Sequence, residues 1–409
     1  MHFIYNIGIW ALGFVMRILS LFNPKAKNWV TGRANIFNQL PLTENHEVIW
    51  FHCASLGEFD QGLPLMQIIK SNQPNCFLLV TFFSPSGMNH YHKRQHSADH
   101  VMYLPLDTQS NANKFIQHFN PTQAFFVKYE FWSNYIFEAK KNNTSIYNVS
   151  GVFREDQPFF RWYGSFFRKT LNKFDWFFVQ NKHSKELLKS IKINNVSVTG
   201  DSRFDKVIDN KKNVSSDVII ETFCAGQKPL VIGSSWPEDE KYILDIVNNL
   251  SKKVIIAPHN VDENHVTRIT SKLKVDYSRY TKATENDTLK NSKVLILDTI
   301  GQLSNAYSYC SIAYVGGGFS GSLHNILEPA VFGLPVIFGP KHKRFPEGQV
   351  FVNNGFGFSI SSTQELREAL SKIEANHASI QEKELNFIND NAGASLKIYK
   401  HISSNVKIS

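Results

Sequence analysis

Glu58 has the side chain and the position of a general base. The apolar run 48–54 (VIWFHCA) is a strand candidate, and Ser55-Leu56-Gly57-Glu58 then leads into a helix. A carboxylate at that point can accept a proton from a hydroxyl group in a transition state, and Gly57 would permit a tight turn and the close approach of a ligand. The alternative is a structural glutamate that interacts favourably with the helix dipole.

A glycine-rich segment in the second half of the chain has the character of a phosphate-binding loop. The apolar run 311–318 ends in Gly316, Gly317 and Gly318, and a helix is expected to begin near His324. Backbone N–H groups and a helix N-terminus together attract an anion. The spacing is neither that of a Walker A loop nor that of a strict dinucleotide-binding fingerprint. The segment therefore predicts a phosphate cradle or, as the alternative, a glycine turn that binds no ligand.

Two further segments offer polar groups to the same ligand. Glu328 lies four residues after His324, about one helical turn further on, where its carboxylate can accept hydrogen bonds from ribose hydroxyls. The strand candidate 228–235 ends at Gly233-Ser234-Ser235, whose hydroxyls and amides could form a second edge of the phosphate site. Pro237 and the acidic residues after it suit the first turn of a helix.

These motifs need a fold that brings strand ends and helix starts together. Short apolar runs alternate with helical stretches, which indicates βαβ units and parallel sheets buried on both faces. The expected strands are 48–54, 76–83, 101–106, 124–130, 145–151, 176–181, 228–235, 252–259, 293–299, 311–318 and 334–340.

The length of the chain and one polar stretch indicate two domains. A chain of 409 residues exceeds one ordinary core, and the charged stretch 206–217 looks like a connector. We therefore expect an α/β fold of two Rossmann-like lobes, one over 25–210 and one over 218–409. Ligands of such folds bind at the carboxyl ends of strands, so the cleft between the lobes is the expected active site.

The amino-terminal segment 1–24 is expected to be a membrane anchor. Residues 3–22 are apolar, and Arg17 is the only Lys, Arg, Asp or Glu before Lys25. Twenty residues at about 1.5 Å each would just span a hydrocarbon core of about 30 Å. A spanning helix, a helix lying in the interface and a core-packing helix all remain open. The basic stretch that follows would keep the rest of the protein in the cytoplasm.

Charge and cysteine content narrow the class of protein. The net charge of +9 indicates an acidic partner, but it does not choose between nucleic acid, anionic lipid and a phosphorylated substrate. No basic–aromatic nucleic-acid motif is recognised, so no nucleic-acid partner is expected. The cysteines are far apart and lack metal-ligand spacing, so we expect buried thiols in a reducing compartment. They are Cys53, Cys76, Cys224 and Cys310.

Over nearly the whole chain, to about residue 350, these segments resemble the bacterial 3-deoxy-D-manno-octulosonic acid (Kdo) transferases. The family's longest segment, GGHNxLEPAxFGLPVxFGP, is similar to residues 322–340 (SLHNILEPAVFGLPVIFGP) and is the most specific match. The segments SVGE, TxTxTG, ETELWPN and GSTHxGEE are similar to residues 55–58 (SLGE), 81–87 (TFFSPSG), 128–134 (KYEFWSN) and 233–240 (GSSWPEDE).

The resemblance implies a two-lobed glycosyltransferase of the GT-B type, with an inverting mechanism and neither metal nor cofactor. It implies transfer of Kdo from CMP-Kdo to the lipid A precursor at the cytoplasmic face of the cell inner membrane, beside anionic lipid, with Glu58 as the base. The acceptor side would include Ser55, Gly57, Ser86, Lys128 and Glu130. The donor nucleotide would be held by Gly233, Ser234, Ser235, His259, Gly316, Gly317, Gly318, His324, Asn325 and Glu328.

Three positions depart from the family pattern. Lys128 stands where the family often has Glu, Leu323 where a Gly usually precedes the His, and Pro258-His259-Asn260 where Pro-Arg-His is common. The positive charge that the family's arginine would supply on the donor side would then come from His259, Lys341 or Lys343. The alternative function is that of another two-lobed sugar enzyme, a transferase or an epimerase, that uses a uridine nucleotide.

Overall fold

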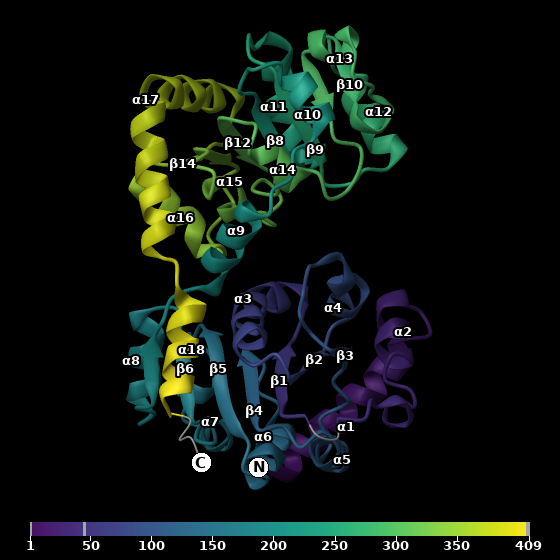
Figure 1. The fold of residues 1–409 in the computed structure, drawn as a ribbon, viewed down its shortest axis with the longest axis vertical. Coiled ribbons are helices and arrows are strands. Elements are labelled where there is room, and N and C mark those ends of the chain that lie inside the picture. The colour runs from purple at the N-terminus through teal and green to yellow at the C-terminus, as the bar shows by residue number, and fades with distance from the viewer. Residues whose placement is uncertain (1, 44–45, 406–409) are drawn as a thin grey trace. The chain divides into compact units, whose positions relative to one another are not determined.

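The chain forms two compact units, each built on a parallel sheet (Figure 1). The computed structural model describes residues 2–43 and 46–405. The first unit consists of Met1–Lys206 with Asn391–Ser409, and the second unit consists of Val207–Asp390. The expected α/β class with two Rossmann-like lobes is confirmed.

The first unit contains a seven-stranded sheet in the order β3-β2-β1-β4-β5-β6-β7. Its strands are β1 (Val48–Cys53), β2 (Phe77–Phe82), β3 (His100–Tyr103), β4 (Gln123–Val127), β5 (Ser145–Gly151), β6 (Trp176–Val179) and β7 (Val196–Val198). Its helices are α1 (His2–Leu19), α2 (Pro24–Thr31), α3 (Leu56–Asn72), α4 (Pro85–His90), α5 (Gln109–Phe119), α6 (Ser133–Lys141), α7 (Ser165–Leu171), α8 (Lys182–Ser190) and α18 (Ala394–Asn405), with the 3-10 helices η1 (Ile36–Gln39), η2 (Tyr91–Lys93) and η3 (Pro158–Phe160).

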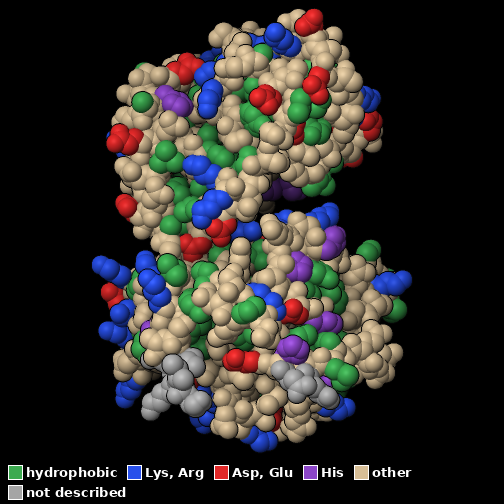
Figure 2. Space-filling view, viewed as in Figure 1, with side chains coloured by type: hydrophobic (Ala, Val, Ile, Leu, Met, Phe, Trp, Pro, Cys, Tyr) green, Lys and Arg blue, Asp and Glu red, His purple; other side chains and the backbone are tan. Residues whose placement is uncertain are grey.

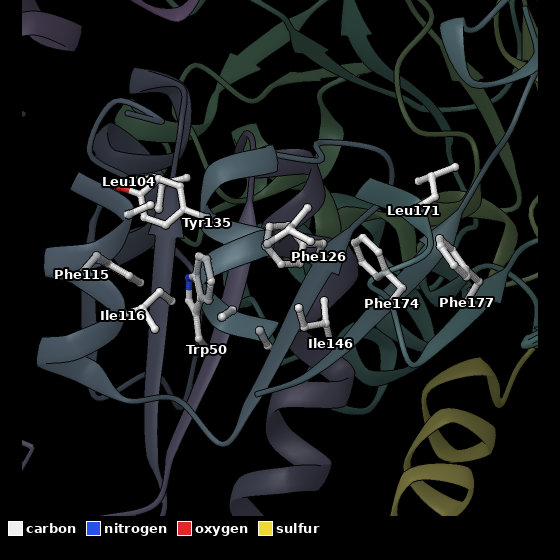
Figure 3. Close-up of a cluster of buried hydrophobic side chains, with 14 of the residues drawn as sticks. Trp50, Leu104, Phe115, Ile116, Phe126, Tyr135, Ile146, Leu171, Phe174 and Phe177 are labelled. Carbon is white, nitrogen blue, oxygen red and sulfur yellow. The ribbon is translucent and has the colours of Figure 1, made fainter. Parts of the chain in front are cut away.

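Alternate residues of β1 enter two different cores, because successive side chains of a strand point to opposite faces of the sheet. Trp50 joins the cluster under α5 and α6, whereas Phe51 joins the cluster under α3 and α18. In Figure 3 the rings of Trp50, Phe126 and Phe174 lie side by side along the first of these faces. Burial on both faces explains why these strands read as continuous apolar runs.

The second unit contains another seven-stranded parallel sheet, in the order β10-β11-β9-β8-β12-β13-β14. Its strands are β8 (Leu230–Ser235), β9 (Val254–Pro258), β10 (Tyr277–Arg279), β11 (Val294–Ile296), β12 (Ile312–Val315), β13 (Val336–Phe338) and β14 (Gly357–Ser359). Its helices are α10 (Val218–Cys224), α11 (Pro237–Asn249), α12 (Glu263–Thr270), α13 (Asp287–Asn291), α14 (Leu303–Tyr307), α15 (Leu327–Ala330), α16 (Pro346–Asn354) and α17 (Thr363–Asp390), with the 3-10 helix η4 (Tyr280–Lys282).

The expected domain boundaries need two corrections. The stretch 206–217 does not begin as a loop, because α9 (Ser202–Lys212) runs through the border between Lys206 and Val207. The second lobe also does not extend to residue 409. The chain returns to the first unit at Asn391, where Ile398 and Ile402 of α18 join the core that contains Phe51. The apolar face of α18 is buried in that core.

Helix α1 is an exposed helix with one face docked on the first unit. Its outward residues recur at helical spacing, as expected for an amphipathic helix; they are Phe3, Ile4, Ile7, Trp10, Phe14, Val15 and Ile18. On the inward side, Tyr5 donates a hydrogen bond to Asp107, and Asn134 Nδ2 donates to Asn6 Oδ1 at 2.9 Å. The reading of 3–22 as a core-packing helix is therefore wrong.

Candidate active site

Each sheet has one position where the direction of winding reverses, and the motifs gather there. In the first sheet this position lies between β1 and β4, and in the second between β8 and β12. The connections that leave two such strands run to opposite sides and leave room for a ligand at the carboxyl ends. Glu58 follows β1 and Lys128 follows β4, while Gly233–Ser235 form the end of β8 and Gly316–Gly318 follow β12.

Glu58 lies in the first turn of α3, as expected, and its carboxylate has two partners. Lys128 Nζ lies 3.2 Å from Glu58 Oε1, and the Ser55 hydroxyl donates a hydrogen bond to Glu58 Oε2. Ser55 occupies the N-cap of α3 but makes no capping hydrogen bond with its side chain. The serine is therefore used to hold the carboxylate and not to cap the helix.

The charges around Glu58 keep it ionised. Burial would raise the pKa of Glu58, but the Lys128 ammonium and the Ser55 hydroxyl outweigh it and lower that pKa below its ordinary value. The pKa of Glu130 moves the other way, because burial and the nearby charge of Glu58 both raise it. Two carboxyl groups with pKa values pushed apart are typical of sites with divided acid–base roles.

The backbone of Lys128 is held in an uncommon conformation. Its φ is +63°, in the left-handed region that residues other than glycine rarely adopt. The fully buried Asn148 side chain donates to the carbonyl oxygens of Phe126 at 3.0 Å and Lys128 at 2.5 Å. A strained residue fixed by a buried amide places the lysine beside the glutamate, and such strain is commonly found at functional sites.

The loop after β4 is also held through Trp132. Its indole N–H donates to His52 Nε2 at 3.0 Å, and its ring stacks on Phe83 with centroids 4.6 Å apart. Burial, followed by the charge of Arg33, lowers the pKa of His52 to about 3, so this histidine is neutral and accepts the bond. The segment 128–134 is thereby anchored to β1 and to the loop after β2.

Gly57 and Ser86 play smaller parts in this geometry than expected. A side chain at Gly57 would meet only Ser55 Oγ at 3.8 Å, so the turn itself does not require glycine, although the space is open. Ser86 lies in the first turn of α4, where its backbone N–H donates to Ser84 Oγ at 3.2 Å. Its exposed hydroxyl lies 3.1 Å from Ser84 Oγ.

An aromatic cluster forms at the carboxyl ends of β8 and β9 in the second unit. Trp236 stacks on His259 with ring centroids 4.1 Å apart, and its indole N–H donates to His324 Nε2 at 3.1 Å. Burial, followed by the charge of His259, lowers the pKa of His324 to about 4. Burial and then the charge of His265 lower the pKa of His259. Both imidazoles are therefore neutral at neutral pH, and His259 does not supply the missing positive charge.

The glycine loop allows close packing between backbone segments. A side chain at Gly316 would lie 2.2 Å from Ser234 O, and one at Gly318 would lie 2.4 Å from Gly339 N. Several of the amides expected to receive the phosphate already donate within the protein. They belong to Gly316, Gly317, Gly321, Ser322 and His324. The expected phosphate cradle therefore stays a prediction, and these five amides would have to exchange their present partners to bind a phosphate.

The expected helix near His324 is wrong. Helix α15 begins only at Leu327 and has four residues, so neither a long helix dipole nor a regular turn separates His324 from Glu328. Glu328 is instead reached by Asn325, whose Nδ2 lies 3.3 Å from Glu328 Oε1. Burial, followed by the negative charge of Glu328, raises the pKa of Tyr307, whose hydroxyl lies 2.6 Å from the place where a side chain at Gly233 would begin.

Ser235 is likewise not available to a ligand. Its hydroxyl is fully buried and donates to Glu240 Oε1 at 3.2 Å, and the same oxygen lies 2.6 Å from His265 Nε2. Ser234 differs, because it is only half-buried and has a φ of +54°. Of the two serines at the end of β8, Ser234 therefore remains the one that could face a phosphate.

Asp239 is a positioning residue that the sequence did not reveal. One carboxylate oxygen accepts the backbone N–H groups of Trp236 and Gly317, both at 2.9 Å, and the other accepts the Tyr314 hydroxyl at 2.8 Å. The side chain is fully buried. It therefore joins the loops after β8 and β12, although the sequence shows only an acidic residue in the first turn of a helix.

Lys341 lies against the glycine loop. Its backbone N–H donates to Gly318 O at 2.8 Å, and its Cβ lies 3.8 Å from the place where a side chain at Gly321 would begin. The side chain of Lys341 is exposed.

Within the described ranges 2–43 and 46–405, no group of three or more His, Cys, Asp and Glu residues could hold a metal ion. The four cysteines are buried and free, as expected.

Comparison with known sequences gives a consistent family. A family model described as 3-deoxy-D-manno-octulosonic-acid transferase (kdotransferase) matches residues 30–206. A 3-deoxy-D-manno-octulosonic acid transferase of Rickettsia prowazekii is 27% identical over 387 residues, which cover 90% of this chain and 82% of the relative. One of Aquifex aeolicus is 26% identical over 333 residues, 80% of this chain and 85% of the relative.

Comparison with solved structures shows the fold. A UDP-GlcNAc 2-epimerase from Neisseria meningitidis aligns with a TM-score of 0.58 at 14% identity, covering 88% of this chain and 100% of that one. A glycosyltransferase from Rickettsia africae aligns with a TM-score of 0.54 at 15% identity, with the same coverage. At such identities the likeness extends to the fold alone.

Proposed function

Because this chain belongs to the Kdo transferase family, we propose that it transfers Kdo from CMP-Kdo to the lipid A precursor in lipopolysaccharide biosynthesis. As a member it is a glycosyltransferase with two lobes of the GT-B type. The observation that best supports the proposal is the ionised Glu58, held by Lys128 and Ser55 where the winding of the first sheet reverses. The reaction would proceed with inversion and without a metal ion.

Glu58 is the general base of the proposed reaction. A sugar hydroxyl of the acceptor attacks the anomeric carbon of Kdo, the bond from that carbon to the phosphate oxygen of CMP breaks, and the hydroxyl proton passes to Glu58. CMP leaves with the electron pair of the broken bond. The Lys128 ammonium, 3.2 Å from the carboxylate, keeps Glu58 unprotonated before the attack.

The second unit supplies the groups for the nucleotide. Glu328 would accept hydrogen bonds from the ribose hydroxyls, and the exposed Lys341 ammonium would face the phosphate next to the glycine loop. Trp236 donates to His324 Nε2, so the neutral imidazole carries its proton on Nδ1 and can donate there to a phosphate oxygen. Charge that develops on the phosphate would be stabilised by these fixed donors.

We further propose that α1 lies in the interface of the inner membrane on its cytoplasmic side. It is the one helix of the described residues that is long and apolar enough to cross a membrane. Tyr5 and Asn6 nevertheless bind the first unit through hydrogen bonds, and Ile9 is buried against it. A helix docked along one side can insert its apolar face to about 5–10 Å while the domain stays outside the bilayer.

A single assay tests the proposed reaction. Purified full-length protein is incubated with CMP-Kdo and a tetra-acylated lipid A precursor, and the lipid product is measured by mass spectrometry. We expect a mass gain of one or more Kdo residues, which the Glu58→Gln protein does not produce. If CMP-Kdo gives no product and UMP binds more tightly than CMP, the alternative of a uridine-nucleotide sugar enzyme holds instead.

A further inference from the structure

The turn before α7 exposes two aromatic side chains beside the proposed membrane helix. Trp162 is 91% exposed and Tyr163 is 46% exposed, and Arg161 before them is exposed as well. Single exposed apolar residues are common on the surfaces of soluble proteins and need no special explanation. An adjacent Trp and Tyr next to a cation are, however, the residue types that concentrate at the headgroup level of membranes.

This turn is rigid, so the exposure does not result from a loose loop. Arg168 Nη1 donates to the carbonyl oxygens of Phe159 at 3.0 Å and Arg161 at 2.9 Å. Gly164 N donates to Arg161 O at 3.0 Å, and a side chain at Gly164 would lie 2.0 Å from Pro158 O. The fold therefore holds Trp162 outward, and its ring lies 5.6 Å from the Tyr163 ring, measured between centroids.

The helix that follows the turn packs against the N-terminal end of α1. Phe166, in the first turn of α7, packs against the rings of His2 at 5.8 Å and Tyr5 at 5.3 Å. Trp162 lies four residues before Phe166, at most about 15 Å along the chain. The same end of α1 exposes Phe3 and Ile4, by 76% and 64%.

We propose that residues 161–163 form a second membrane contact, which inserts the Trp162 indole among the lipid headgroups. The proposal rests on the proposed attachment of α1 to the membrane. The indole N–H and the Tyr163 hydroxyl would remain hydrogen-bonded at the interface, and Arg161 would pair with anionic lipid. One helix alone leaves the protein free to roll about the helix axis. A second contact beside that axis would fix how the edge with Glu58 faces the membrane.

A basic surface elsewhere on the first unit offers the alternative. Helix α8 carries Lys182, Lys185 and Lys189, and Figure 2 shows blue side chains gathered where Figure 1 labels this helix. If charge alone directed binding, α8 would contact the lipid. It lacks exposed Trp and Tyr, however, and it connects β6 and β7 at the sheet edge opposite to β3, next to which α1 docks through Asp107.

Site-specific fluorescence tests the proposal in the full-length protein. The native cysteines are buried, so a thiol-reactive environment-sensitive dye will label Trp162→Cys selectively, with Lys189→Cys as the matched control on α8. On addition of phosphatidylethanolamine–phosphatidylglycerol vesicles we expect a blue shift and brighter emission at 162, quenching by spin-labelled lipid, and no change at 189. Separately, Trp162→Ser should weaken vesicle binding about tenfold, with an unchanged melting temperature.

Each other outcome overturns the proposal in a distinct way. If the protein binds vesicles and the probe at 162 stays in an aqueous environment, the second contact does not exist while the attachment of α1 stands. If the probe at 189 responds and the probe at 162 does not, the basic face of α8 is the contact. If the unlabelled protein does not bind vesicles at all, the attachment of α1 fails as well. A blue shift at 162 without lipid, which grows with protein concentration, would assign the turn to a second copy of the chain.

Discussion

Lys128 Nζ lies 3.2 Å from Glu58 Oε1, across the position where the winding of the first sheet reverses. Lysine at this position is a departure from the pattern of the family, which often has glutamate there. The ammonium lowers the pKa of Glu58, whereas a carboxylate in its place would raise it by repulsion. The carboxylate of Glu58, the proposed base, is therefore ionised over a wider range of acidic pH.

Removing the Lys128 charge should move the pH dependence of catalysis. The acid limb of kcat/KM reports the pKa of the essential base in the free enzyme. Since Lys128 lowers the pKa of Glu58, Lys128→Met should raise it and shift the acid limb to higher pH. The measurement is kcat/KM against pH with CMP-Kdo and the lipid acceptor. The control is Lys140→Met, which breaks an exposed ion pair with Asp175 and should leave the limb in place. An unshifted limb in Lys128→Met would separate Lys128 from the base.

The donor site can be tested by comparing CMP with cytidine, which lacks the phosphate. Glu328→Ala should weaken the binding of both by about 10- to 150-fold, since a lost hydrogen bond to a charged group costs about 1.5–3 kcal/mol. Lys341→Met should weaken CMP binding and leave cytidine unchanged. Calorimetry measures both. Lys343→Met is the matched control, and if it removes the preference for CMP while Lys341→Met does not, the assignment of the charge to Lys341 is wrong.

Glu384 is a buried carboxyl group that costs stability. It lies on α17, is fully buried, and neither oxygen has a hydrogen-bond partner among the described residues. Burial raises its pKa well above the ordinary value. A group with a raised folded-state pKa contributes stability below its unfolded pKa, and this contribution is lost as pH rises toward the folded value.

Glu384→Gln should therefore raise the melting temperature, and the gain should grow between about pH 5 and pH 8. The neutral amide does not have to ionise as pH rises, so the slope of stability with pH that Glu384 causes disappears. The matched control is Glu382→Gln, which changes an exposed glutamate on the same helix. A gain that is equal at both pH values would show that Glu384 is not the titrating group.

Structural features that depend on a local pattern of residues were predicted well from the sequence. The buried strands are recognisable as apolar runs in the sequence. Glu58 was placed correctly at the start of α3, because the end of a strand, a polar residue and a segment with helical spacing of apolar residues follow one another directly. The strands β7, β10 and β14 were missed. They have three residues each and lie at or next to sheet edges, and so short a run shows no period.

Features that depend on the order of strands could not be predicted. Lys128 and Glu58 are 70 positions apart and meet only because β4 pairs with β1. The glycines after β12 were read as a ligand loop, whereas their lack of side chains is required where Gly318 passes Gly339 and Gly316 passes Ser234. Such backbone contacts between distant loops leave no local signal in the sequence.

The exposed face of α1 should determine membrane binding without affecting the fold. Ile7→Asn with Phe14→Asn replaces two outward apolar side chains, 51% and 64% exposed, so it should weaken sedimentation with vesicles and keep the melting temperature. Deletion of residues 1–24 is a poorer test, because it removes Tyr5, one of the hydrogen-bond donors to the buried Asp107, and should lower the melting temperature. Undiminished sedimentation of the double variant would exclude this face as the lipid contact.

The assignment of Glu58 as the base is tested by Glu58→Gln. The amide keeps the size of the side chain and can still accept a hydrogen bond from the Ser55 hydroxyl, but it cannot take a proton from the acceptor. General-base catalysis contributes about 10²–10⁴-fold, so turnover should fall at least about a hundredfold. CMP binding should be unchanged, because Glu58 belongs to the first unit and the nucleotide groups belong to the second.

If Glu58 served only the start of α3, the substitution would cost a few tenths of a kcal/mol of stability and leave turnover intact. Turnover and melting temperature measured on one preparation separate the two. Near-normal turnover would reject Glu58 as the base and turn attention to Glu130, the neighbouring carboxyl group with the raised pKa.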